Sequence, residues 1–271
     1  MTQASWDPGQ YLRHEGHRSR PFQDLLHRVP RLPGPAPRIA DLGCGAGNVT
    51  ALLAERWPAA RITGFDTSAD MLHAARRYAG PTAGGGAIDF REGDAARWLP
   101  DEPYDLVVSN AALQWVPNHR EMIPRWIDGL APGGVLAFQV PGQAGARSHV
   151  LLGELCDGAE WADRLGGLGL RRSGVSDPAG YLDLLAGPGR RVDAWETTYA
   201  QLLTGDNPVL DWVKGSALRP VLTALAADPA AADRFLARYA AALREAYPPG
   251  PHGTVYPFRR VFAVVATDQE K

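Results

Sequence analysis

The stretch Asp41-Leu-Gly-Cys-Gly-Ala-Gly47 decides how this 271-residue chain folds. It overlaps the end of a short apolar run, Arg38–Leu42, and leads into a helical pattern over Asn48–Arg56. A strand, a glycine turn and a helix in this order form a nucleotide-type binding loop, because glycine lets a ligand approach the backbone and the helix N-terminus offers unpaired N–H groups. The stretch therefore predicts a cofactor loop that contains Gly43, Gly45 and Gly47.

The glycine spacing on its own leaves two interpretations open. Glycine accounts for 30 of the 271 residues, so an ordinary glycine-rich turn explains the triplet as well as a binding loop does. The GxGxG spacing differs from the GxGxxG of dinucleotide-binding folds, which weighs against NAD. The residues that follow the loop have to decide between these interpretations.

The next apolar run, Ala60–Asp66, ends in an acid at the distance where a second strand presents a carboxylate to ribose. A carboxylate suits a diol because it accepts two hydrogen bonds at once. Capping of the helical run Met71–Tyr78 by Asp66, Thr67 or Ser68 is the alternative, and the two roles are compatible. We place Asp66 in the cofactor site.

Two further strands end in polar loops. Asp94 and Ala95 follow the run Ala87–Arg91, although Gly-Asp is also ordinary turn chemistry. The β-branched run Tyr104–Ser109 resembles a buried parallel strand and leads into a segment that starts at Asn110. From this segment we place Asn110 in the cofactor site.

Strand and helix patterns alternate from Arg38 to Val140, which predicts an α/β domain with a parallel sheet. The loops named above all fall on the edge where the strands end, which is where such sheets bind ligands. Two later runs, Arg191–Tyr199 and Tyr256–Thr267, predict a closing antiparallel strand pair. The expected domains are an N-terminal helical segment over the cofactor, an α/β core and a helical cap over the substrate, at residues 1–37, 38–205 with 251–271, and 206–250.

Composition narrows the classes of function. The formal net charge of −2 gives no sign of a general nucleic-acid binder, and no apolar stretch approaches the roughly 20 residues that span a bilayer. The start of the chain lacks the basic and apolar blocks of a signal peptide. Two cysteines, Cys44 and Cys156, make neither a disulfide framework nor a metal site. We expect a cytoplasmic protein without metal, nucleic-acid or membrane partners.

The loop and its acid resemble the D-x-G-x-G-x-G motif of class I S-adenosyl-L-methionine (SAM) methyltransferases. Over nearly its whole length the chain resembles one family, the trans-aconitate 2-methyltransferases. The matching stretches are Trp6–Pro8, Tyr11–Leu12, Arg18–Pro21, Asp41–Asn48, Trp57–Asp66, Asn110–His119, Trp195–Tyr199, Asp211–Pro220 and Tyr256–Arg260. The Leu-Gln-Trp-Val-Pro and Leu-Arg-Pro runs within them are the specific ones, because all SAM methyltransferases share the glycine loop.

The resemblance implies a Rossmann-like methyltransferase sheet, SAM as cofactor and a small tricarboxylate as substrate, in a monomer or weak homodimer. It implies methyl transfer to one carboxylate of trans-aconitate, with S-adenosyl-L-homocysteine as the second product. The cofactor-binding residues expected on this basis are Tyr11, Arg20, Asp41, Gly43, Gly45, Gly47, Asp66, Thr67, Met71, Asp94, Ala95, Asn110, Ala111 and Leu113. The expected substrate-binding residues are His17, Arg18, Gln114, Trp115, Arg219, Tyr247, Tyr256 and Arg259.

The chemistry of such a reaction agrees with these residue types. A carboxylate is already ionised at neutral pH, so no general base is required and only positioning by residues such as Gln114 and Trp115 is expected. Holding a trianion calls for arginines, which pair bidentately with carboxylates, although any one of them could form a surface ion pair instead. Arg259 and Arg260 alternate on one strand, so at most one reaches the site. Trp115 could equally pack in the core.

Two other functions stay open at this point. A methyltransferase for another small acceptor, such as a phenol or an amine, would need a catalytic base, for which His17 and His119 are the candidates. A module that binds SAM or a nucleotide without catalysis, or an NAD oxidoreductase, is the third possibility.

Overall fold

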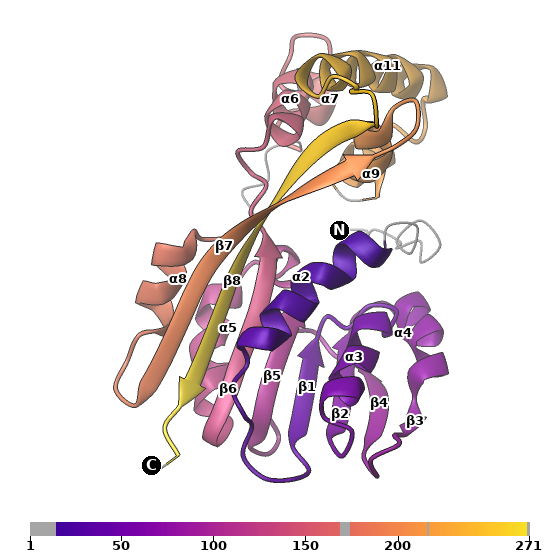
Figure 1. The fold of residues 1–271 in the computed structure, drawn as a ribbon. Helices are drawn as coiled ribbons and strands as arrows, with labels where there is room; N and C mark the ends of the chain where they lie inside the picture. The colour runs from indigo at the N-terminus through magenta and orange to yellow at the C-terminus, as the bar shows by residue number, and fades with distance from the viewer. Residues whose placement is uncertain (1–14, 169–173, 216, 270–271) are drawn as a thin grey trace. The chain divides into compact units, whose positions relative to one another are not determined.

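The structure, a computed structural model, describes residues 15–168, 174–215 and 217–269, with side chains from residue 19 onward. Its centre is an eight-stranded sheet with the order β3-β4-β2-β1-β5-β6-β8-β7 (Figure 1). The strands are β1 (Arg38–Leu42), β2 (Arg61–Asp66), β3 (Gly80–Pro81), β4 (Ala87–Glu92), β5 (Tyr104–Asn110), β6 (Leu130–Pro141), β7 (Arg190–Leu203) and β8 (Thr254–Thr267).

Neighbouring strands from β4 through β2, β1 and β5 to β6 are parallel. Strand β8 then pairs antiparallel with β6, and the short β3 pairs antiparallel with β4. This arrangement confirms the predicted Rossmann-like sheet, which is mostly parallel and is closed by late strands that run back along it. The middle of β5 is fully buried, as a parallel strand covered on both faces should be.

Helices lie before and between these strands along the chain. They are α2 (Glu15–Arg28), α3 (Asn48–Arg56), α4 (Ala69–Ala75), α5 (His119–Asp128), α6 (Arg147–Cys156), α7 (Ala162–Leu165), α8 (Pro178–Leu185), α9 (Pro208–Lys214), α10 (Arg219–Ala224) and α11 (Pro229–Ala246), with short 3-10 turns at Arg76–Tyr78 and Leu113–Trp115. Proline stands in the first turn of α8, α9, α10 and α11, where its missing N–H has no helical partner to lose.

The chain divides into two compact units. Of the described residues, the smaller unit takes 142–168 and 198–259, and the larger takes the rest. Strands β7 and β8 each contribute residues to both units. Because each unit has its own hydrophobic core, the two are described separately.

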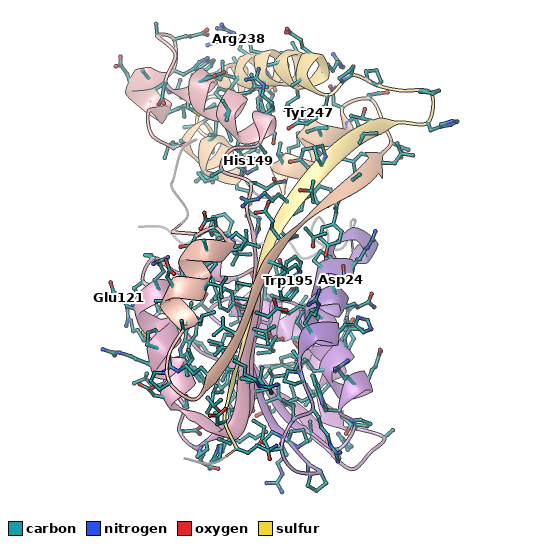
Figure 2. All side chains as sticks on the ribbon, turned by 60° about the vertical axis from the view of Figure 1, so that its left-hand side comes forward. Asp24, Glu121, His149, Trp195, Arg238 and Tyr247 are labelled. Carbon is teal, nitrogen blue, oxygen red and sulfur yellow. The ribbon has the colours of Figure 1, made fainter. Side chains whose placement is uncertain are left out.

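In the larger unit, α5 and α8 pack on the sheet around Trp126 and Tyr181, which are fully buried. Helix α2 crosses the sheet in front of β6 in Figure 1. Its last residue, Arg28, pairs with Asp193 of β7 at 3.0 Å and stacks over the ring of Trp195, which in turn stacks on Phe262 (Figure 2). These contacts fasten α2 to the late strands of the sheet.

In the smaller unit, α9, α10 and α11 lie between residues 206 and 250, where the sequence predicts a helical segment. Their apolar faces surround Phe235 and Tyr239, together with residues of α6 and the ends of β7 and β8. The predicted insertion is therefore part of a larger compact unit. Its role as a cap over the substrate, like that of the N-terminal segment over the cofactor, stays a prediction. Among the described helices, none is long and apolar enough to cross a membrane.

Candidate cofactor and substrate site

The three loop glycines differ in what surrounds them. All three have left-handed backbone, with φ of 77°, 55° and 77° at Gly43, Gly45 and Gly47. A Cβ at Gly43 would stand 2.2 Å from that of Ala112, and one at Gly47 would stand 2.8 Å from the ring of Phe90. A Cβ at Gly45 would meet nothing within 4 Å. Packing thus requires glycine at two positions, whereas Gly45 borders open space that a ligand can fill.

Asp66 and the end of β2 hold this loop in place. The backbone N–H groups of Gly43 and Cys44 donate to the carbonyl oxygen of Phe65, at 2.8 and 3.0 Å. Oδ2 of Asp66 accepts from the N–H of Gly45 at 2.9 Å, and its Oδ1 accepts from the N–H of Ser68. The Asp66 carboxylate is therefore part of the loop structure, and each of its oxygens keeps one lone pair for a ligand.

Asp41 lies fully buried behind the loop. Its Oδ2 accepts a 2.7 Å hydrogen bond from the hydroxyl of Thr50, whereas Oδ1 is buried with no hydrogen-bond partner among the described residues. Burial raises the pKa of this carboxyl to about 7, and the Thr50 hydroxyl only partly opposes that rise. An orphaned carboxylate oxygen at this place fits a positively charged ligand group.

Ser68 is the residue that caps α4, with its hydroxyl accepting from the N–H of Met71. Thr67 is exposed, and the Met71 side chain is buried. Asp94 forms a turn in which its Oδ1 accepts from the N–H of Ala96 at 2.9 Å. Ala95 packs at the edge of the large hydrophobic core. The turn is thus present, and the cofactor roles of these residues stay predictions.

Asn110 ends β5 and is 6% exposed. Its Oδ1 accepts a hydrogen bond from Nε2 of Gln139 on β6. The next residue, Ala111, has a φ of 55°, the only positive φ at a non-glycine position in the described chain. Such strained residues gather at functional sites. The side chain of Leu113 is fully buried in the core, so only its backbone could contact a cofactor.

The two positioning candidates differ in exposure. Trp115 is 51% exposed, so core packing is not its role. Gln114 donates from Nε2 to the carbonyl oxygen of Ala111, and its Oε1 is buried without a partner among the described residues. Gln114 therefore offers an unused acceptor four residues after Asn110.

His119, a candidate base for another acceptor, is fully buried. Its Nδ1 lies 2.9 Å from the carbonyl oxygen of Val116, and its Nε2 lies 3.1 Å from the hydroxyl of Tyr181. The carbonyl can only accept, so Nδ1 carries the proton and the tyrosine donates to Nε2. Burial also lowers the pKa of His119. Both ring nitrogens are occupied in a structural network, which argues against a base.

In the smaller unit, three tyrosine hydroxyls surround Ser148 at the start of α6. Tyr247 accepts from the N–H of Ser148 at 3.0 Å, Tyr239 donates to its carbonyl oxygen at 2.8 Å, and the Tyr256 hydroxyl lies 3.2 Å from its Oγ. Tyr256 is fully buried. The two tyrosines expected at the substrate therefore already anchor α6. Figure 2 labels Tyr247 and the neighbouring His149, whose pKa burial lowers to about 4.

The arginines expected at the substrate lie in different surroundings. Arg219, at the start of α10, and Arg259, on β8, are half-buried, and Arg259 donates to the carbonyl oxygen of Gly142. Arg260 is only 4% exposed and donates from Nη1 to Oε1 of Gln139 at 3.1 Å. Arg20 is exposed on α2. Tyr11 and the side chains of His17 and Arg18 lie outside the described residues.

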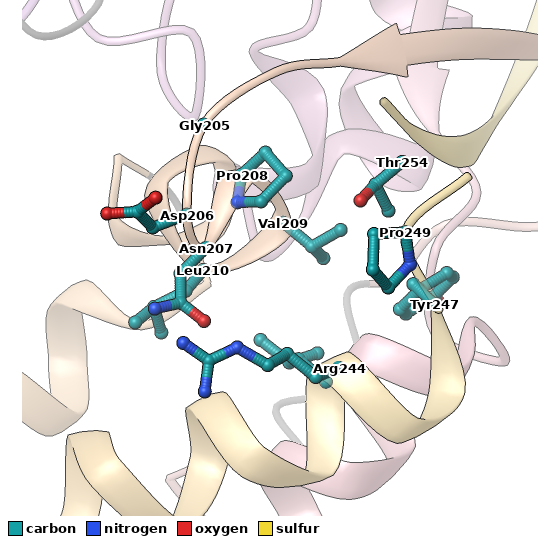
Figure 3. A pocket seen from close by; sticks show the side chains of 11 residues that line it. Gly205, Asp206, Asn207, Pro208, Val209, Leu210, Arg244, Tyr247, Pro249 and Thr254 are labelled. Atoms are coloured by element: carbon teal, nitrogen blue, oxygen red, sulfur yellow. The ribbon is translucent and has the colours of Figure 1, made fainter. Parts of the chain in front are cut away.

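Of two hollows in the described chain, one is too small for a ligand and the other lies away from the predicted site residues. One, in the smaller unit, has a volume of about 60 Å³ and is lined by Arg244 and Tyr247 among others (Figure 3). Ligand pockets typically measure about 300–1,000 Å³. The other, of about 370 Å³, lies beside Pro37 and Trp57, at the edge where the strands begin. Within the described ranges, no group of three or more His, Cys, Asp or Glu residues could hold a metal ion.

Several residues of these networks carry no sequence signal. Thr50, Gln139 and Ser148 stand in ordinary helix and strand patterns, and their partners lie between 9 and 108 positions away. Only the three-dimensional register brings such pairs together. The loop acids and glycines were identifiable because chain neighbours define their motif.

Comparison with known proteins supports the same fold and family. A family model for a methyltransferase domain matches residues 39–134. The phosphoethanolamine N-methyltransferase 2 of Haemonchus contortus, solved with S-adenosyl-L-methionine, matches with a TM-score of 0.52 at 15% identity, over 93% of this chain and 53% of that one. The YcgJ protein of Bacillus subtilis matches with a TM-score of 0.53 at 14% identity, over 93% and 99%. These structures share the fold.

Curated relatives match over almost the whole chain. The trans-aconitate 2-methyltransferase of Streptomyces coelicolor is 61% identical over 97% of this chain and 87% of its own length. The enzyme of the same name from Streptomyces avermitilis is 62% identical over 96% of both chains, and that from Rhodococcus jostii is 48% identical over 96% and 98%. The chain therefore belongs to the trans-aconitate 2-methyltransferase family of SAM-dependent methyltransferases.

Proposed function

We propose that this protein transfers a methyl group from SAM to one carboxylate of trans-aconitate and releases a monomethyl ester. The observation that carries the proposal is the glycine loop. It is open at Gly45 and fixed by Asp66, in a chain 61–62% identical to relatives named for this activity. A cofactor bound by this loop lies at the C-terminal ends of the strands, which is where such sheets bind ligands.

The larger unit supplies the residues proposed to hold SAM. The open space at Gly45 admits the ligand to the backbone, and the Asp66 oxygens that brace the loop also accept from the ribose diol. Asp41, whose Oδ1 is buried without a partner among the described residues, is proposed to ionise and to stabilise the cationic cofactor when SAM is bound. When bound, SAM supplies a methyl group on a positively charged sulfur. Asp94, Asn110 and the other predicted residues complete the proposed site.

The protein's own contribution to the reaction is positioning. A carboxylate acceptor with a pKa of about 4 is ionised at neutral pH, so the enzyme has no proton to remove. Correct orientation of two reactants lowers the barrier by itself, with effects as large as several kcal/mol. The structural use of both nitrogens of His119 agrees with a reaction that needs no base.

The acceptor carries three carboxylates and needs cationic partners. Arg219 and Arg259 are the proposed ones, each pairing bidentately with a carboxylate, which is worth about 1.5–3 kcal/mol per charged hydrogen bond. The other residues proposed to bind the acceptor are His17, Arg18, Gln114, Trp115, Tyr247 and Tyr256. A monomer or weak homodimer in the cytoplasm is the expected form, and size-exclusion chromatography tests the oligomeric state.

Turnover of SAM with a panel of acids tests the proposal. Trans-aconitate should be methylated faster than cis-aconitate, citrate and isocitrate, if the proposed arginines match its arrangement of carboxylates. Equal turnover of all four acids would indicate a methyltransferase that does not distinguish between these carboxylic acids. No turnover with any of them, in a protein that binds SAM, would refute the proposed function.

A further inference from the structure

A chain of three buried polar side chains crosses the sheet from β8 to β5. Nη1 of Arg260 donates to Oε1 of Gln139 at 3.1 Å, and Nε2 of Gln139 donates to Oδ1 of Asn110. Their residues are 4%, 0% and 6% exposed. All three belong to the larger unit. The register supports the chain, because Gln139 of β6 lies opposite Asn110 of β5 and Arg260 lies opposite Pro141.

The hydrogen bonds in this chain can run in only one direction. A guanidinium has donors and no acceptor, so Gln139 must turn its oxygen to Arg260. Its Nε2 group then faces Asn110, which must present Oδ1 to it. A flipped Asn110 would set two N–H donors against each other in a buried place, which is strongly unfavourable. Arg260 therefore fixes the orientation of the Asn110 amide through Gln139.

The fixed amide stands at the edge where the cofactor site is proposed. Asn110 ends β5, the strained Ala111 follows it, and the next residue, Ala112, packs against Gly43 of the glycine loop. The N–H of Ala111 also donates to the backbone oxygen of Gln139 at 2.9 Å. With Oδ1 occupied, the free end of the amide is Nδ2, which makes no hydrogen bond to another described residue. It is a donor without an assigned acceptor.

We propose that Arg260 and Gln139 are positioning residues that hold Asn110 with its Nδ2 group directed as a donor to a carboxylate oxygen of a bound ligand. This inference rests on the proposed function, because both SAM and the acceptor carry carboxylates. Arg260 thus acts through two amides, in contrast to Arg259, the strand neighbour expected to touch the substrate directly.

The replacement Gln139→Glu should reverse the direction of the hydrogen bond to Asn110, with a side chain of the same shape at position 139. A glutamate accepts from Arg260 and also from Asn110, so Asn110 turns its Nδ2 inward and presents Oδ1 to the ligand. An acceptor then faces a carboxylate. We expect at least about tenfold weaker binding of one ligand, with the thermal midpoint of unfolding preserved by the buried Arg260–Glu pair. Asn110→Asp should have the same effect, and Arg260→Lys, which keeps a donor, should restore most of the binding lost in Arg260→Met.

Two measurements separate the sources of the carboxylate. Calorimetry with S-adenosyl-L-homocysteine reports the cofactor, and the KM for trans-aconitate at saturating SAM reports the acceptor. A loss confined to either measurement supports the inference and names the ligand. The control is Thr267→Val at the other end of β8, which removes hydrogen bonds to the carbonyl oxygens of Ala131 and Gly134 and should change stability alone.

The inference fails if Gln139→Glu and Asn110→Asp both keep the affinity and the KM within about twofold of the wild type. It also fails if binding falls only in step with stability, as in the control. If Gln139→Glu does not fold, Gln139→Met is measured in the same way and should lose binding, since it releases Asn110. Wild-type turnover is measured first, so a failure of the proposed function is recognised independently of these variants.

Discussion

The carboxylate of Asp66 and the backbone N–H of Gly45 are joined by a hydrogen bond of 2.9 Å. The acid that the sequence predicts at the ribose thus also braces the one loop glycine that borders open space. This hydrogen bond links the end of β2 to the glycine loop after β1. One carboxylate shapes the loop and remains able to accept from a ligand.

The three glycines should respond differently to substitution. Gly45→Val places a side chain in the open space and should weaken SAM binding at least about tenfold, with a backbone strain of about 1–2 kcal/mol. Gly43→Ala collides with Ala112 and should mainly reduce the free energy of unfolding, by about 1–3 kcal/mol. Calorimetry with SAM and thermal unfolding of both variants measure the contrast. Wild-type affinity in a folded Gly45→Val protein would contradict the loop assignment.

Asp41 should make the cofactor-free protein less stable as the pH rises. Its pKa rises from an ordinary 3.8 to about 7 in the folded chain, so the folded state binds more protons than the unfolded state between these values. Stability from this group is present below about pH 4 and is lost as the pH passes through 7, by up to about 1.4 kcal/mol per pH unit.

Asp41→Asn copies the protonated form and keeps an acceptor for Thr50. The thermal midpoints of the variant and the wild type should therefore be close at about pH 4 and should separate by about pH 8, with the variant higher. Thermal scans without ligand at several pH values measure this. A difference that stays constant with pH would show that Asp41 is not buried in a protonated form.

His119→Gln should be folded and active. Loss of the contacts to Val116 and Tyr181 should reduce the free energy of unfolding by about 1–3 kcal/mol, whereas kcat should change little because the imidazole has no free nitrogen. Urea unfolding and the pH dependence of kcat measure the two effects. A large fall in kcat that removes an ionisation from the pH profile would instead favour an acceptor that needs a base.

Arg219→Ala should raise the KM for trans-aconitate about tenfold or more and leave SAM affinity unchanged, because a carboxylate loses its bidentate partner. Arg238→Ala is the matched control, since Arg238 is exposed on α11 and pairs with Glu160. Steady-state kinetics with each substrate varied in turn distinguish the two. Equal KM values in both variants would remove Arg219 from the acceptor site.

Local patterns predicted much of the fold. Strand β1 and helix α3 begin and end at the predicted residues, because one glycine loop separates a short apolar run from a helical period. The three helices between residues 206 and 250 begin close to prolines that mark first turns. Helix α7 and strand β3 have four and two residues, too few to show any period, and the sequence did not indicate them.

The candidate site was only partly predictable. The loop glycines and Asp66 are recognisable because chain spacing defines their motif. The exposure of Trp115, the use of Tyr247 and Tyr256 by Ser148, and the Arg260–Gln139–Asn110 chain depend on tertiary register. Strand alternation predicts opposite faces for Arg259 and Arg260, but it could not say that the buried Arg260 would meet a glutamine of the neighbouring strand.

The most direct test of the account is to identify the product that the wild-type protein makes from SAM and trans-aconitate. Mass spectrometry and NMR should show a single monomethyl ester that mild alkali returns to trans-aconitate, formed in equal amount with S-adenosyl-L-homocysteine and absent with Gly45→Val. Methylation at carbon or nitrogen, or no product from a protein that binds SAM, would contradict it.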